Sequence, residues 1–112
     1  MRGDFERLQD VLEAISKIET QVSSAEAFVA DELLQVWVVY PLQILGEAVS
    51  KVSLGLREQY ADVPWKQIIG MRNILVHDYF GIDCDLVWTV VERDLPTLKG
   101  QITAILQTLS PA

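Results

Sequence analysis

Several residue types that carry common protein chemistry are scarce in this sequence. It has one cysteine, Cys84, and one histidine, His77. A single cysteine excludes an internal disulfide and agrees with a reducing compartment, and a single histidine argues against a histidine-rich metal site. Neither a glycine-rich phosphate-binding loop nor a His-Glu-x-x-His motif is present. We therefore expect no metal and no cofactor.

A long uninterrupted apolar run is also missing. The most apolar stretch, from Leu33 to Leu45, is shorter than the roughly 18 residues of a membrane span and carries two glutamines and Pro41. The first ten residues hold charges where a signal peptide needs an apolar region. We expect no membrane partner and a cytoplasmic location.

Positive charge is scarce, and its distribution is uneven. The formal net charge is -7 at pH 7, which ordinarily argues against binding to nucleic acid. The balance is −6 over residues 1–50, +1 over residues 51–80 and −2 over residues 81–112. Only the middle of the chain could therefore face a phosphate backbone without strong repulsion. This pattern excludes a protein that coats nucleic acid, but it allows one that cuts it.

The sequence does contain helical periodicity, with apolar residues at three- and four-residue steps, and it has no alternation typical of a strand. The 112 residues, 50% of them hydrophobic, suit one domain. We predict an all-α fold, a single domain over residues 1–112 that forms an up-and-down bundle of four or five helices. Prolines at 41 and 96 predict two bends. The expected helical segments are residues 4–22, 25–30, 31–52, 54–60, 64–79, and a last one from Asp83 or Asp85 to 109.

The segment from Trp65 to Phe80 does not show one clean apolar stripe. Its apolar side chains lie on three sides of an ideal helix. A helix that is apolar nearly all round is usually buried on more than one side, and a second copy of the chain is the simplest additional cover. We predict a homodimer on this basis, although a central bundle helix would give a similar pattern.

Polar residues in this segment need an explanation. Asn73 and His77 are four residues apart and share a helix face, whereas Arg72 and His77 lie about 140° apart. One regular helix would not direct both Arg72 and His77 at one phosphate unless its end unwinds or a two-fold axis supplies the second copy's residues. A structural interpretation is equally open, in which Asn73 and His77 form a buried polar pair and Arg72 pairs with an acid such as Glu47.

The stretch PWKQIIGMRNILVHDYFGID, residues 64–83, resembles the HepT-like family of the HEPN superfamily. Arg72 and His77, with four residues between them, match the superfamily motif, and Asn73 and Tyr79 match the form that the family adds. Further similarity lies in ILGEAVSK at residues 44–51 and in the run at residues 87–96, so that the resemblance covers nearly the whole chain. Pro41 departs from the pattern, because a continuous helix is expected there.

The resemblance implies a HEPN-like homodimer with the two motifs lining a shared cleft, and a metal-independent endoribonuclease activity on RNA, with no DNA partner. Arg72 and His77 would be the catalytic residues and Asn73 a supporting one. An unperturbed histidine, with a pKa of about 6.5, suits proton transfer, and arginine suits phosphate. The resemblance further implies the toxin of a type VII HepT/MntA toxin–antitoxin system. An MntA-type nucleotidyltransferase antitoxin would silence it by transferring AMP to Tyr79.

Two other functions are compatible with the sequence. The chain could be a non-catalytic nucleotide- or partner-binding subunit of a minimal nucleotidyltransferase, which the acidic charge balance favours. It could also be a helical scaffold, in which case substitutions at Arg72 and His77 would lower the melting temperature and change no activity.

Overall fold

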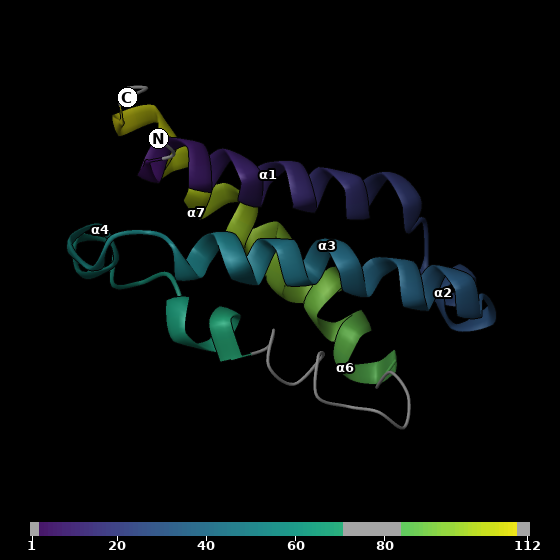
Figure 1. Ribbon diagram of the computed structural model, residues 1–112. Helices are drawn as coiled ribbons and strands as arrows, with labels where there is room; N and C mark the ends of the chain where they lie inside the picture. The colour runs from purple at the N-terminus through teal and green to yellow at the C-terminus, as the bar shows by residue number, and fades with distance from the viewer. Residues whose placement is uncertain (1–2, 71–83, 110–112) are drawn as a thin grey trace.

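Every secondary-structure element that the computed structural model describes, over residues 3–70 and 84–109, is helical, which confirms the predicted all-α fold. Figure 1 shows α1 and α3 side by side and antiparallel, with α7 crossing behind them, in a molecule measuring 41 × 26 × 26 Å. The elements are α1 (Asp4–Gln21), α2 (Ala25–Ala30), α3 (Glu32–Ser50), α4 (Leu54–Gln59), a helix described over residues 65–70, α6 (Cys84–Thr89), the π-helix η1 (Val90–Asp94) and α7 (Leu95–Thr108).

Side-chain caps fix where three of the helices begin. The hydroxyl of Ser24 accepts a hydrogen bond from the backbone N–H of Ala27, and the carboxylate of Asp31 accepts one from Leu34, both at 3.1 Å. Ser53 caps α4 in the same way. Each such cap contributes about 1 kcal/mol. The predicted starts of the second and third segments are therefore confirmed.

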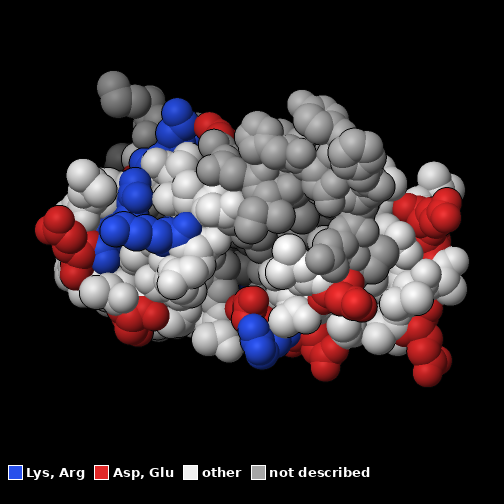
Figure 2. All heavy atoms as spheres, turned by 90° about the horizontal axis from the view of Figure 1, so that it is seen from below, with Lys and Arg blue, Asp and Glu red and all other residues white. Residues whose placement is uncertain are grey.

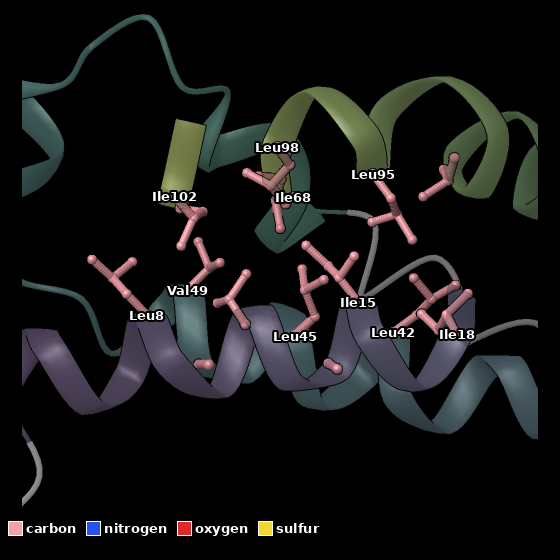
Figure 3. Close-up of a cluster of buried hydrophobic side chains, with 14 of the residues drawn as sticks. Leu8, Ile15, Ile18, Leu42, Leu45, Val49, Ile68, Leu95, Leu98 and Ile102 are labelled. Carbon is pink, nitrogen blue, oxygen red and sulfur yellow. The ribbon is translucent and has the colours of Figure 1, made fainter. Parts of the chain in front are cut away.

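The core lies where α1, α3, α7 and the helix at residues 65–70 meet. Figure 3 shows side chains from all four elements pointing toward one another. Ile15 of α1, Leu45 of α3 and Ile102 of α7 are fully buried, and Ile68 is 8% exposed. Because Ile68 belongs to this core, the packing of the three long helices fixes the position of residues 65–70.

The last segment differs from the single bent helix that we predicted. The π-helix η1 separates α6 from α7 and ends two residues before Pro96. Proline has no backbone N–H and clashes with the carbonyl four residues earlier, so a π-turn accommodates it. Pro41, in contrast, lies inside an unbroken α3, and the bend expected there stays a prediction.

Of the described helices, α3 alone has the length and apolar composition that a membrane span requires, with 39% of the relevant window buried inside the protein. The buried share faces α1 and the core. Four other large apolar side chains of α3 are exposed, namely Leu33, Val36, Trp37 and Tyr40.

Gly100 offers a test of the energetics of α7. It is exposed in the middle of the helix, and a Cβ added there would meet nothing within 4 Å. We expect Gly100→Ala to stabilise the protein by about 0.5–1 kcal/mol, because glycine loses more backbone entropy on folding than alanine. The urea concentration at the midpoint of unfolding measures this change in stability. Ala104→Gly, at another exposed position of α7, is the reverse control, and a lower midpoint for Gly100→Ala would contradict the expectation.

Candidate functional site

The predicted site residues Arg72, Asn73, His77 and Tyr79 lie outside the described residues, as does Asp83, one of the two expected caps of the last segment. The structure describes instead the two elements that flank this stretch of chain. They are the helix at residues 65–70, which precedes it, and α6, which follows it. The surface between these elements is the candidate functional site.

Trp65 anchors the element that precedes the motif. Its indole ring is 5% exposed, and its Nε1 donates a hydrogen bond to the carbonyl of Tyr60 at 3.1 Å. The Tyr60 hydroxyl lies 2.9 Å from the hydroxyl of Thr108 in α7. These contacts hold the start of the helix at residues 65–70 against α7, so the chain reaches Gly70 at a defined place.

Buried side chains also anchor the element that follows the motif. Val87 of α6 is 1% exposed, and the Trp88 ring packs against Phe28 of α2, with the ring centroids 5.7 Å apart. Val90 of η1 is also buried. The two ends of the stretch at residues 71–83 are therefore both attached to the bundle core.

A groove of about 790 Å³ connects these two anchors. Gly70, at the end of the first flank, and Leu86, near the start of the second, both line it, so the described residues on either side of the motif border this groove. Its walls come from α3, residues 62–70, α6, η1 and α7. Among the described residues, the lining consists of Leu45, Asp62, Pro64, Gln67, Ile68, Gly70, Leu86, Val90, Arg93, Asp94, Leu95, Thr97, Leu98 and Gln101.

The groove has an apolar floor and a polar rim. The floor is made of aliphatic side chains that are at most 8% exposed, and the rim carries Asp62, Gln67, Arg93 and Asp94. The Arg93 guanidinium pairs with Asp94 at 3.2 Å. One amide stands out in the wall, because the Oε1 atom of Gln101 is buried and accepts no hydrogen bond.

Basic side chains gather near one end of the same face. In Figure 2, which views the molecule from the side of residues 65–70 and α6, blue side chains lie toward the end that carries α4, and red ones dominate the end that carries α2. Arg57 has a structural role, because its guanidinium donates hydrogen bonds to the backbone carbonyls of Ser50 and Val52. Acidic side chains lie beside the basic ones at the α4 end in the same view, so the charge there is mixed.

Within residues 3–70 and 84–109, no group of three or more His, Cys, Asp and Glu side chains could hold a metal ion. The metal independence of the activity stays a prediction. The groove residues Gln67, Leu86 and Gln101 were not predicted from the sequence. Their local patterns are those of ordinary helix residues, and only the packing brings them together.

Comparison with known proteins places these observations in a family. The family model described as "Ribonuclease HepT-like" matches residues 8–105. A "Probable ribonuclease HepT" from Thermococcus cleftensis is 35% identical over 102 residues, which is 89% of this chain and 93% of the relative. A "Putative RNase" from Caldanaerobacter subterraneus is 42% identical over 84 residues, 75% of each chain.

One relative is considerably longer. A "Gamma-glutamylcyclotransferase and putative RNase" from Methanocaldococcus jannaschii is 38% identical over 112 residues, 97% of this chain but 50% of the relative. The chain thus spans about half the length of that protein. No solved structure matches the chain.

Proposed function

Because this chain belongs to the HepT-like ribonuclease family, we propose that it is a metal-independent endoribonuclease with Arg72 and His77 as its catalytic residues. The observation that carries the proposal is the Arg-x4-His motif within the family match, in a stretch of chain that begins and ends at the groove.

The proposed chemistry is an internal transfer at the RNA phosphate. His77 takes the proton of a ribose 2′-hydroxyl, whose oxygen attacks the adjacent phosphorus, and the bond to the 5′-oxygen breaks. A proton returned to that oxygen completes the step, so the products are a 2′,3′-cyclic phosphate and a 5′-hydroxyl. Arg72 supplies a permanently charged, planar group for the phosphate as its negative charge grows. Asn73 supports this site by orienting the imidazole or contacting the phosphate.

In this proposal, a base next to the phosphate that is cut lies in the groove. Its floor is apolar, which suits the face of a nucleobase. Unstacked single-stranded bases are the usual targets of sequence-dependent RNA recognition, so a single-stranded substrate fits this surface best.

A homodimer would resolve the angle between the two catalytic residues. Arg72 and His77 lie about 140° apart on an ideal helix, and a two-fold axis can place Arg72 of one copy opposite His77 of the other. The two motifs would then line one cleft, with a groove on each side.

We further propose that the chain is the toxin of a type VII HepT/MntA toxin–antitoxin system. Its partner is an MntA-type nucleotidyltransferase. The phenol oxygen of Tyr79 attacks the α-phosphate of ATP and pyrophosphate leaves, so that Tyr79 carries AMP. Tyr79 is two residues from His77, and a bulky anionic group there would fill the cleft and repel RNA.

Tyr79→Phe tests this regulation. With ATP labelled on the α-phosphate and the partner nucleotidyltransferase present, wild type should take up the label and Tyr79→Phe should take up none, since the phenylalanine ring has no acceptor oxygen. Tyr40→Phe is the matched control, because Tyr40 is 66% exposed and lies in α3, far from Tyr79 in the sequence. Equal labelling of Tyr79→Phe and wild type would contradict the assignment.

The ribonuclease proposal is tested on total cellular RNA with the purified protein in EDTA. Cleavage in EDTA that leaves 2′,3′-cyclic phosphate ends is the expected result. Cleavage that requires an added divalent ion, or that leaves 3′-hydroxyl ends, would contradict the proposed chemistry.

A second candidate function is a non-catalytic subunit that binds a nucleotide or the nucleotidyltransferase. The net charge of -7 and the two aspartates on the groove rim favour it, because both repel an RNA backbone. It predicts that the pure protein leaves RNA intact and forms a stable complex with the nucleotidyltransferase.

A further inference from the structure

The outer side of α3 carries a second apolar face. It consists of four large side chains, each between 38% and 83% exposed, which we name the α3 stripe: Leu33, Val36, Trp37 and Tyr40. They recur at steps of three and four residues, so they lie on one side of the helix. The fully buried residues of α3 point roughly 160° away from them and are Val38, Leu42, Leu45 and Val49. A helix with apolar residues on two opposite sides normally has a neighbour on each.

The α3 stripe borders two hollows in the surface between α1 and α3. The hollows measure about 380 and 300 Å³, and Tyr40 and Ile44 line both of them. Trp37 lines the smaller one. Neighbouring hollows along a pair of packed helices suit an amphipathic helix, which can place apolar side chains from successive turns into a groove.

The charge around this face is mostly negative. Residues 21–50, which include α2 and α3, carry no lysine or arginine, and their acidic side chains are Glu26, Asp31, Glu32 and Glu47. Each hollow is lined by two acidic residues and one basic residue. These are Asp10, Glu47 and Arg7 in the larger hollow and Asp10, Glu13 and Lys17 in the smaller one.

This excess of negative charge distinguishes the surfaces that could cover the α3 stripe. A second copy of the chain brings a net charge of -7 and the same acidic border, and an anionic membrane surface is repelled in the same way. A partner with lysine or arginine beside its apolar side is attracted, because opposite charges at the rim favour encounter and fix orientation. The Lys17–Glu13 pair at the smaller hollow is exposed, and exposed pairs of this kind are weak.

We propose that the α3 stripe and its two hollows are a docking site for a basic amphipathic helix of a partner protein. The helix lies along α1 and α3 with apolar side chains against Trp37 and Tyr40 and in the hollows. Its basic side chains face the carboxylates of the rim. No residue of the stripe lines the groove beside the proposed catalytic motif, so the proposal does not depend on whether the chain cleaves RNA.

A labelled synthetic peptide of leucine and lysine tests the shape of the site. A peptide of about 14 residues spans about 21 Å as a helix, which matches α3 from Leu33 to Glu47. We expect wild type to bind it in fluorescence anisotropy, and a peptide of the same composition without an apolar side to bind much more weakly. Tyr40→Ala should weaken binding about tenfold. Leu54→Ala, at a residue that is 68% exposed in α4, should leave it unchanged. No binding by wild type, equal binding of both peptides, or full affinity of Tyr40→Ala would overturn the proposal.

A pair of charge reversals tests the acidic rim. Glu13→Lys changes an exposed residue at the smaller hollow, and Glu58→Lys makes the same change at an exposed residue of α4. Both variants have the same net charge, so only the position of the charge differs. The lysine peptide should bind Glu13→Lys several times more weakly than Glu58→Lys, and added salt should reduce this difference. Equal affinities of the two variants would show that the rim does not select a basic partner.

Cross-linking in the cells that normally make this protein identifies the occupant itself. The photoreactive residue p-benzoylphenylalanine is placed at position 36, where Val36 is 63% exposed, and the cross-linked peptide is sequenced by mass spectrometry. We expect a segment of another protein with lysine or arginine beside an apolar helical side. A segment from a second copy of this chain, an acidic segment, or a lipid adduct would overturn the proposal.

Discussion

Purified protein with His77→Ala is expected to cleave RNA about 10²–10⁴ times more slowly than wild type, because it lacks the group that moves the proton. The substitution removes a polar side chain and adds no bulk, so the fold should persist. The measurement is the initial rate on total RNA in EDTA, with helicity checked by circular dichroism. The sequence has only one histidine, so no other imidazole in the same chain can substitute.

Matched variants distinguish a catalytic role of a side chain from a general effect of its positive charge. Arg72→Lys keeps the positive charge but loses the planar fork that binds two phosphate oxygens, so its rate should fall well below wild type. Lys66→Ala removes an exposed basic side chain near the same groove and should weaken binding without abolishing cleavage. Full activity of His77→Ala would disprove the assignment, and a lower melting temperature with unchanged activity would support the scaffold interpretation.

Phe28→Ala should lower the free energy of unfolding by about 3–5 kcal/mol. Phe28 is fully buried, and its ring packs against Trp88 of α6 with the centroids 5.7 Å apart. The change leaves a cavity between α2 and α6 and removes the aromatic contact between them. Because α6 directly follows the residues that carry the proposed catalytic motif, the variant also tests whether this aromatic contact holds α6 in place beside the proposed site.

Denaturation in urea measures this effect. Leu54→Ala is the control, since Leu54 is 68% exposed and surface substitutions usually change stability by about 0.5 kcal/mol or less. A loss below about 1 kcal/mol for Phe28→Ala would mean that the α2–α6 contact contributes little to the fold.

The sequence by itself determined the helices and most of the core. Helical periodicity is a local property, so residues such as Leu8, Val11 and Ile15 identify the buried side of α1 before any neighbour is known, and all three are fully buried. Capping is equally local, and the Ser24 and Asp31 side chains cap the helices at the predicted starts of the second and third segments. The Arg72–His77 motif is also a property of the sequence alone.

The tertiary structure decided which surfaces meet. The groove joins Leu45, Gln67, Leu86 and Gln101, which are far apart in the chain, and no local pattern indicates that they share a wall. The π-helix η1, which ends two residues before Pro96, is another feature of the structure, because the sequence predicted only a bend there. Periodicity shows that a helix has an apolar side, but the neighbour that covers it is set by non-local packing. For this reason the sequence predicted an extra apolar face on residues 65–80, and only the structure revealed the exposed one on α3.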